Sequence, residues 1–394
     1  MRVFALGGAG TYGLQTAQKL VASDIVSEIV ISGRNMEAAK KAASGLGSKA
    51  TAVQADVGDE RQLASLLADS DIMVNTAGPE FKVVLPALRA AIEAGVDYCD
   101  LCADGRTREK AIELDSSAKA SGVTALVGIG MAGLSNLMMI HAAHQLDQAE
   151  ELRFCMFVVP STYGEGGPKA FLEQMRKAGH ADASWQEMIN QVAGKVRLYR
   201  DGRWIDVDPI KDGVRITLPQ GREVTAYPAG LSEPITLPRS LPAIRSVSVL
   251  VSYYPPQLNE VFCGLGGRVA RGELNESAAA ISFFEHMVTL PAESLAPPEG
   301  YESGWVWWIE GIGNKQSKRM CYKCWPNGDW AWTTPPLATA ALKILRGEIQ
   351  AKGILSPESC LDPMPFFAEV AQYATERPSD SRLLAESMEP LDHR

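Results

Sequence analysis

The sequence predicts an α/β protein with two domains: a doubly wound parallel sheet, followed by an α+β domain with a mainly antiparallel sheet. Three observations support this fold class. Short β-branched runs alternate with amphipathic stretches over residues 1–133, strand-like runs then follow one another, and helical patterns return after residue 333. The length of 394 residues is sufficient for two domains.

The first domain alternates strand and helix in a regular order. Strands are predicted at residues 3–6, 29–32, 50–54, 71–75, 98–101 and 124–127. Helices are predicted between them at residues 11–21, 36–46, 60–67, 83–94 and 108–120. Because strands alternating with such helices form βαβ units with right-handed crossovers, the sheet is expected to be parallel, with helices on both faces.

The pattern changes after residue 133. Helices are predicted at residues 134–146, 168–178 and 184–192, and later at residues 337–346 and 364–374. Strand-like runs occupy residues 152–159, 195–200, 214–218, 247–254, 305–310 and 318–325. Turn pairs such as Asp201-Gly202 favour antiparallel pairing between successive strands. Residues 376–394 are polar and contain Pro and Ser, so a loosely held tail is expected there.

Composition narrows the range of partners. The net charge of −9 and the pI near 5.3 are a poor match for phosphate backbones, so no nucleic-acid partner is expected. No apolar run approaches the ~20 residues that span a bilayer, and the first residues lack the apolar stretch of a signal peptide. The sequence therefore predicts a cytoplasmic protein without a membrane partner.

A glycine motif lies directly after the first predicted strand and opens the first predicted helix. It reads Gly8, Ala9, Gly10, Thr11, Tyr12, Gly13, which is G-x-G-x-x-G. In this context the first glycine permits a tight turn, the second lets a pyrophosphate approach the backbone, and the third lets helix and strand pack closely. The amides at the helix start favour phosphate binding. The motif predicts a Rossmann dinucleotide site.

The end of the second strand favours NADP over NAD, although NAD remains possible. A NAD site usually has an acidic residue here, but the chain has Ser32, Gly33 and Arg34. Ser32 is expected to donate to a 2′-phosphate, and Arg34 to pair with it. Further cofactor contacts are expected where the third and fourth strands end, at Asp56, Val57, Thr76, Ala77 and Gly78.

Several segments share motifs beyond the glycine loop. They are residues 74–79 (VNTAGP), 91–101 (AIEAGVDYCDL), 130–136 (GMAGLSN) and 353–358 (GILSPE). Together with residues 8–13 they resemble the saccharopine dehydrogenase-like family, which includes saccharopine reductase and lysine ε-dehydrogenase. Ala132 departs from the pattern, since the family usually has Pro there. The resemblance implies that residues 334–375 complete the first domain and that residues 134–333 form a substrate and dimerisation domain, hence a homodimer.

Catalytic groups are expected at the end of the fifth strand, because ligands of such sheets bind beyond the carboxyl ends of the strands. If the substrate is an amine, its nitrogen must lose a proton before hydride leaves the neighbouring carbon. Asp100 is the first candidate to hold or accept that proton, Asp104 is the second, and Tyr98 is a positioning donor. The alternative, that Asp100 only caps the following turn, stays open.

A second glycine loop precedes the helix predicted at residues 168–178. Its amides could capture a substrate carboxylate with the Lys169 ammonium, or form a plain helix entry. The candidate residues are Gly166, Gly167 and Lys169, and other possible carboxylate partners are Arg239, Arg245 and Arg268. No metal is expected at Cys99/Cys102 or Cys321/Cys324, because residues three apart on a strand face opposite sides.

These observations predict an NADP-dependent oxidoreductase. As the family resemblance implies, it would act on a C–N bond of an amino-acid-like substrate that bears a carboxylate, and would form or reduce an imine there. Two alternatives stay open: a carbonyl or enoyl reductase on the same scaffold, and a nucleotide-binding partner protein without turnover.

Overall fold

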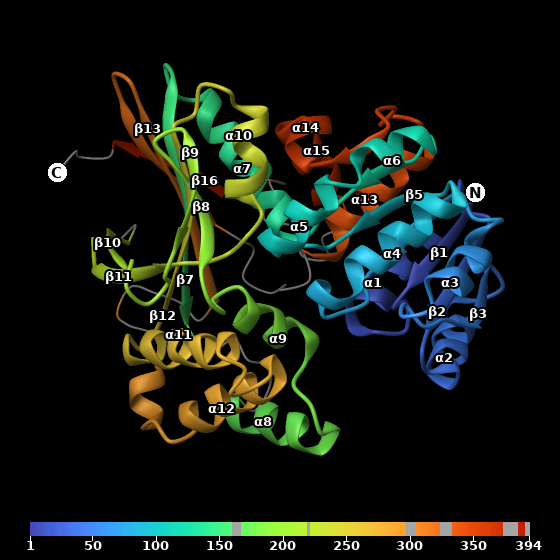
Figure 1. The fold of residues 1–394 in the computed structure, drawn as a ribbon, viewed down its shortest axis with the longest axis horizontal. Coiled ribbons are helices and arrows are strands. Elements are labelled where there is room, and N and C mark those ends of the chain that lie inside the picture. Colours follow the sequence, from blue (N-terminus) through green and yellow to red (C-terminus); the bar gives the residue numbers. More distant parts are fainter. Residues whose placement is uncertain are drawn as a thin grey trace. The chain divides into compact units, whose positions relative to one another are not determined.

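The computed structural model describes residues 1–159, 167–218, 221–296, 299, 304–323, 333–372 and 385–390. The chain divides into two compact units (Figure 1). The first comprises Met1–Met138 with Asn327–Leu383, and the second comprises Met139–Pro326 with Leu384–Arg394. In the described part of the chain, no helix is both long and apolar enough to cross a membrane.

The first unit contains a seven-stranded parallel sheet, so the predicted α/β fold is confirmed. Its strand order is β15-β6-β5-β4-β1-β2-β3. The strands are β1 (Arg2–Leu6), β2 (Glu28–Gly33), β3 (Ala50–Gln54), β4 (Ile72–Asn75), β5 (Asp97–Asp100), β6 (Thr124–Leu126) and β15 (Gly353–Leu355). Without β15 this is the order of the Rossmann fold, which reverses between β1 and β4.

The helices of this unit connect the strands. They are α1 (Thr11–Val21), α2 (Met36–Leu46), α3 (Glu60–Leu67), α4 (Glu80–Ala94), α5 (Gly105–Ile112), α6 (Asp115–Ala120), α13 (Thr334–Leu345), α14 (Pro357–Cys360) and α15 (Pro363–Ala371), with α7 (Met131–His144) leading into the second unit. Asn35 and Asp59 cap α2 and α3 by accepting backbone N–H bonds. The single helix predicted at residues 108–120 is instead two helices, α5 and α6.

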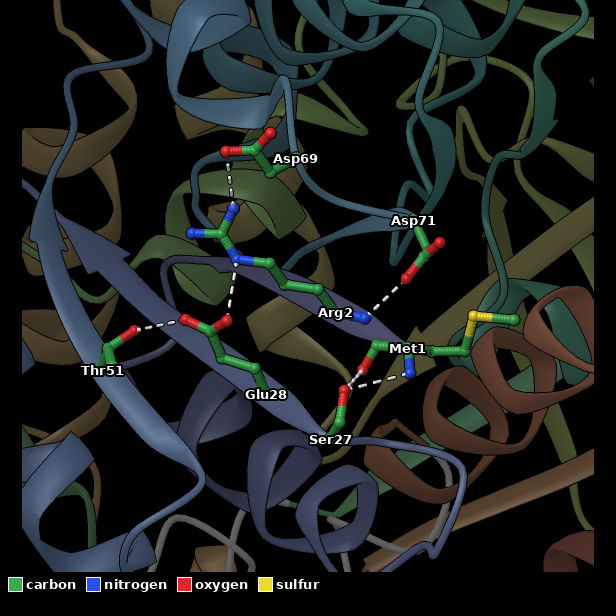
Figure 2. A network of polar contacts seen from close by, with 7 residues as sticks. All are labelled: Met1, Arg2, Ser27, Glu28, Thr51, Asp69 and Asp71. Carbon is green, nitrogen blue, oxygen red and sulfur yellow. Dashed lines mark hydrogen bonds and ion pairs between the residues drawn. The ribbon is translucent and has the colours of Figure 1, made fainter.

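Polar contacts tie together the amino ends of the strands (Figure 2). Arg2 pairs with Glu28 at 3.2 Å and with Asp69 at 3.6 Å, and its backbone N–H donates to Asp71. Thr51 on β3 donates to the other Glu28 oxygen. These residues lie at the opposite end of the sheet from the glycine loop, and so the carboxyl ends of the strands remain the place for a ligand.

The second unit contains a nine-stranded mixed sheet, which confirms the predicted, mainly antiparallel second sheet. Its main path is β10-β11-β12-β7-β13-β14-β16, with β8 and β9 attached through β12. Only β12 and β7 pair in parallel along it. The strands are β7 (Ala149–Val159), β8 (Val196–Arg200), β9 (Arg203–Val207), β10 (Val214–Thr217), β11 (Glu223–Pro228), β12 (Ser246–Tyr253), β13 (Gly304–Gly313), β14 (Ser317–Lys323) and β16 (Ala385–Pro390).

Helices and an aromatic cluster complete this unit. The helices are α8 (Gly167–Ala178), α9 (Ala183–Asn190), α10 (Glu233–Ser240), α11 (Gln257–Ala270), α12 (Glu276–Met287) and the 3₁₀ helix η2 (Ala292–Leu295). Phe171, Trp185, Phe283 and Phe284 pack ring against ring where α8, α9 and α12 meet. These ring contacts bury apolar surface and stabilise the packing of α8, α9 and α12 against one another.

The expectation of a loosely held tail is corrected in part. Residues 385–390 form β16, an edge strand that pairs antiparallel with β14 on the side away from β13. The segment pairs through backbone hydrogen bonds, which a polar sequence can form as well as an apolar one. Residues 376–384 and 391–394 lie outside the described residues.

Candidate functional site

The loop between β1 and α1 is shaped by glycines that have no room for a side chain. Gly7 has a φ of +74°, and a Cβ there would lie 2.6 Å from the backbone nitrogen of Ala77. A Cβ on Gly13 would collide with the backbone of Gly7 and Gly8. The tight turn predicted at Gly8 is therefore made by Gly7, because Gly7 has the left-handed φ.

The start of α1 fits a diphosphate. Gly10 is the N-cap, is exposed, and has no side chain to occupy the helix entry. A Cβ on it would meet only the Gly7 carbonyl, at 3.2 Å, so its outer side is open to an approaching group. Thr11 and Tyr12 follow in the first turn, where backbone amides carry partial positive charge.

The two residues predicted to contact a phosphate at the end of β2, Ser32 and Arg34, lie in different environments. Arg34 is exposed, and its carbonyl accepts a hydrogen bond of 3.1 Å from the Gln54 side chain at the end of β3. Ser32 is fully buried, and its hydroxyl donates to the carbonyl of Ala5. The expectation that Ser32 donates to a phosphate is thus corrected: its hydroxyl is used between β1 and β2, and its own carbonyl accepts from Gly8 in the glycine loop.

The other predicted cofactor residues lie at strand ends. Asp56 is exposed and accepts the backbone N–H of Gly58, so its carboxylate also shapes its own turn, and Val57 beside it is half-buried. Thr76 donates to the Leu6 carbonyl at 3.0 Å. Ala77 is the backbone neighbour of Gly7, and Gly78 after it is exposed. The ends of β1 and β4 are therefore held against each other where the sheet order reverses.

Asp100 is committed to the protein itself. The residue is 1% exposed. One oxygen accepts from the Tyr98 hydroxyl at 2.7 Å, and the other accepts from the backbone N–H groups of Cys102 at 3.0 Å and Gly128 at 2.7 Å. Tyr98 is completely buried and accepts from the Asn75 amide at 3.0 Å.

This geometry corrects the first catalytic expectation for Asp100 and Tyr98. A proton acceptor must reach the substrate, but both carboxylate oxygens are occupied by donors of the protein. Burial raises the pKa of Asp100, while the bonds from Tyr98, Cys102 and Gly128 and the charge of Arg108 oppose that rise. Burial, followed by the charge of Asp100, raises the pKa of Tyr98 well above its ordinary value. The bond from Cys102 agrees with the alternative that Asp100 caps the following turn, whereas Gly128 lies 28 residues away and the pattern of residue types gave no signal of it.

Asp104, the second catalytic candidate, is also a structural group. It is 1% exposed, is the N-cap of α5, and accepts the backbone N–H of Thr107 at 2.7 Å. Arg106 approaches its other oxygen at 3.9 Å. Glu80, which the sequence interpretation missed, accepts the backbone N–H of Ala103 and holds the same loop from α4. The loop after β5 is thus fixed by three carboxylates, those of Asp100, Glu80 and Asp104.

The predicted substrate loop belongs to the second unit. Gly166 lies outside the described residues. Gly167 begins α8 with a φ of +65°, and Lys169 in its first turn is exposed. Among the alternative arginines, Arg239 lies over the Trp204 ring, Arg268 pairs with Glu273, and Arg245 is exposed.

Within the described ranges, no group of three or more His, Cys, Asp or Glu residues could hold a metal ion. Cys99 and Cys102 are fully buried, and burial raises the pKa of Cys99 well above its ordinary value. The side chain of Cys321 and all of Cys324 lie outside the described residues.

Comparisons with known proteins agree with the nucleotide site. Residues 3–126 match the family model of the saccharopine dehydrogenase NADP binding domain. The carboxyaminopropylagmatine dehydrogenase of Synechocystis is 24% identical over 393 residues, covering 93% of this chain and 94% of that protein. The trans-acting enoyl reductase of Mycobacterium ulcerans is 23% identical over 194 residues, 47% of this chain and 46% of that protein.

A solved structure shares the whole fold. The apo saccharopine dehydrogenase (L-Glu forming) of Saccharomyces cerevisiae matches with a TM-score of 0.65 at 17% identity, covering 98% of this chain and 99% of that one. The fold, the glycine loop and the family match define an NADP-binding oxidoreductase of the dehydrogenase or reductase class. They also support the predicted resemblance: the chain is similar to proteins of the saccharopine dehydrogenase-like family in its NADP-binding domain and in its overall fold.

Proposed function

We propose that the protein acts on a C–N bond of a small substrate that bears a carboxylate, oxidising an amine to an imine with NADP or reducing an imine to an amine with NADPH. The observation that carries the proposal is the match to carboxyaminopropylagmatine dehydrogenase over nearly the full length of both chains. That name contains a carboxyl group, an amino group and agmatine, and it describes a dehydrogenase. The enoyl reductase relative covers less than half of this chain, so the alternative reaction has weaker support.

The residues of the first unit would hold the nucleotide. Amides at the start of α1 would bind the diphosphate, Gly10 would let it approach, and Arg34 would pair with the 2′-phosphate. When bound, NADP supplies hydride transfer, and the protein supplies position and orientation. We do not propose Asp100 as the proton acceptor, because the protein's own donors occupy both of its oxygens.

The proposal also includes a homodimer and a substrate carboxylate bound by the second unit, at Gly167 and Lys169 at the start of α8. The homodimer rests on the family resemblance, and the carboxylate site rests on the glycine loop that opens α8. Light scattering on the purified protein tests the dimer. Replacing Lys169 with Met is expected to raise KM for a carboxylated substrate without changing NADPH affinity.

The reaction class is tested with one panel of substrates. Absorbance of the reduced nicotinamide is followed with NADPH and pre-formed or in situ imines of amino acids and diamines, in parallel with ketones and enoyl thioesters. Secondary amines with NADP test the reverse direction. We expect turnover on the C–N substrates only.

Turnover confined to a ketone or an enoyl thioester would replace the proposed reaction with the alternative reductase. Tight NADPH binding without turnover on any substrate of the panel would favour a nucleotide-binding partner protein. An isotope experiment sharpens the result: with deuterium on the transferred position of the nicotinamide, the label should appear on the carbon of the new C–N bond.

A further inference from the structure

A series of hydrogen bonds links the loop after β4 to Asp100. The charge of Arg108 acts on Asp100, and Arg108 in turn donates to the Leu355 carbonyl of β15. We propose that Arg108 and Glu358 are positioning residues for the NADP site, which act through Asp100 on the loops beneath the dinucleotide. The inference concerns nucleotide binding and does not depend on the substrate proposed above.

The series of hydrogen bonds begins beside the diphosphate loop. The backbone N–H of Ala77, which packs on Gly7, donates to the Asn75 side-chain oxygen at 3.0 Å. The Asn75 amide donates to the Tyr98 hydroxyl at 3.0 Å, and that hydroxyl donates to Asp100 at 2.7 Å. An ionised carboxylate accepts hydrogen bonds and does not donate them. An ionised Asp100 therefore fixes which group donates and which accepts in every bond of this series.

Asp100 also fixes the loop after β6. Its side chain accepts from Gly128, and its carbonyl accepts from Ile129 at 2.8 Å. Gly128 has a φ of +83°, and a Cβ there would lie 2.5 Å from the Cys102 carbonyl. The loops that follow β5 and β6 therefore share one carboxylate, and the loop after β4 is linked to it through Asn75 and Tyr98. All three loops lie at the carboxyl ends of the strands, where such folds bind nucleotides.

Arg108 on α5 supplies the positive charge near Asp100. The residue is 1% exposed, and its Nη2 donates to the Leu355 carbonyl of β15 at 2.9 Å. Within the described residues, its Nη1 is buried without a hydrogen-bond partner. Burial lowers the pKa of Arg108, and among the groups that oppose this effect Glu358 is the strongest.

Glu358 is the matching anion. Both of its carboxylate oxygens are buried without a hydrogen-bond partner in the described part of the chain. Buried charges are costly unless opposite charges offset them. No ion pair within 4.0 Å joins Arg108 and Glu358 in the described residues, but the charged groups of both are buried and the charge of Glu358 raises the pKa of Arg108, so we infer that each offsets part of the cost of burying the other. Glu358 reaches this place because β15 adds to the sheet beside β6 and α14 follows at once.

The charged and titratable groups around Asp100 come from several elements. Tyr98 and Cys99 lie on β5, Cys102 on the following loop, Arg108 on α5, and Glu358 with Cys360 on α14. Arg108 is the cation that lowers the pKa of Asp100. Removing the charge of Arg108 would raise the pKa of Asp100, so that Asp100 binds a proton at higher pH. The new O–H would then face the groups that donate hydrogen bonds to this carboxylate.

The pairing is tested by a double-mutant cycle on NADPH affinity, measured by calorimetry. The variants are Arg108→Met, Glu358→Gln and their combination, with urea unfolding followed in parallel. We expect each single change to weaken NADPH binding at least about fivefold, and the double variant to lose less than the product of the two. Unchanged affinity in both single variants, whatever happens to stability, overturns the proposal.

The exposed pair Arg89 and Glu60 on α4 and α3 is the matched control. Arg89→Met and Glu60→Gln remove the same groups where water screens them, so NADPH affinity should stay within about twofold. If Arg108→Met does not fold, Arg108→Lys replaces it, because Lys keeps the charge but lacks the planar guanidinium. The NADPH affinity of Glu358→Gln can be measured in either case. Weakened NADPH binding in the Arg89 control of the same size as in Arg108→Met contradicts a specific role.

A pH profile separates positioning from a purely structural role. As pH falls through its pKa, Asp100 protonates and the loops lose their shared acceptor, so NADPH affinity should fall on the acid side. Arg108→Met should move this fall to higher pH, whereas Arg89→Met should not. The 2′-phosphate of NADPH titrates in every variant, and only the difference between variants counts. Identical profiles for wild type and Arg108→Met overturn the proposal.

Asp100→Asn distinguishes positioning from catalysis. The Asn side-chain NH2 group would face donors from Gly128 and Cys102 or from Tyr98, so we expect weaker NADPH binding at every pH. On the acid side only the fall due to the 2′-phosphate should remain. If this variant binds NADPH as the wild type does and loses only turnover, Asp100 is catalytic, and the positioning proposal is wrong.

Discussion

A carboxylate at the end of a Rossmann strand can be used in two ways, and Asp100 illustrates the difference. Its two oxygens accept three hydrogen bonds from groups of three segments, Tyr98, Cys102 and Gly128. Such bonds to an ionised acceptor are worth about 1.5–3 kcal/mol each, and leaving the buried donors without it costs a comparable amount. The same residue type with an open oxygen would be available to a substrate. Burial and partners, not residue type, decide its role.

Arg34 is the residue on which the choice of nucleotide should depend. It is exposed at the end of β2, where its backbone is held by Gln54. Losing one charge-assisted contact of about 1.5–3 kcal/mol corresponds to roughly 10- to 100-fold in Kd. We therefore expect Arg34→Leu to weaken NADPH binding by that factor and to leave NADH binding within about twofold, as measured by calorimetry.

Arg271→Leu, on an exposed arginine of the second unit, serves as the control and should change neither affinity. Equal weakening of NADPH and NADH by Arg34→Leu would show that this guanidinium does not distinguish the two nucleotides. The test is independent of the positioning proposal, because that proposal does not involve Arg34.

For single residues, the sequence predicted those roles that depend on local backbone geometry. Gly13 and the helix start of the glycine loop follow from spacing, since their role lies within six residues of chain. The use of Ser32 inside the sheet and of Asp100 between loops did not follow. Their partners, Ala5 and Gly128, lie 27 and 28 residues away, and no local pattern encodes such pairs.

Elements were predicted well where periodicity was strong. The bounds of α1, α2, β3 and α3 agree with the prediction to the residue, because a helix or strand between clear turn residues has little freedom in length. The short strand β15 and the helices α11 and α12 were not predicted. β15 has three residues, and α11 contains three glycines, which lower its helical propensity.

Two glycine-to-alanine changes, one in α1 and one in α2, separate the effect of close packing from the effect of helical propensity. Gly13→Ala places a methyl group against the backbone of Gly7 and Gly8, so α1 must shift away from β1 and NADPH binding should be lost. Gly45→Ala in α2 meets nothing within 4 Å, and we expect it to stabilise the protein by ~0.5–1 kcal/mol with unchanged NADPH affinity. Urea unfolding and NADPH titration of both variants measure this contrast. Retained NADPH affinity in Gly13→Ala would mean that the loop tolerates an opening between helix and strand.

On the scale of the whole molecule, the last part of the chain serves both units. Residues 353–371 supply β15, α14 and α15 to the first unit, and residues 385–390 supply β16 to the second. The sequence alone predicted the change of domain near residue 133 from the change in pattern. It could not place β16, because the pairing of an edge strand is set by its neighbour β14 and not by its own polar composition.

β16 therefore has a testable role as a cover for the sheet edge. A chain ending at Leu384 leaves β14 with an unpaired row of backbone groups, which in other sheets promotes association with further strands. We expect this variant to scatter more light on mild heating and to unfold at lower urea than a chain ending at Pro390, which keeps β16. NADPH affinity should stay within about twofold in both, because the nucleotide site lies in the first unit. Equal scattering and equal urea midpoints for the two truncations would show that β16 does not protect the edge of β14, and the second unit would then tolerate an open edge.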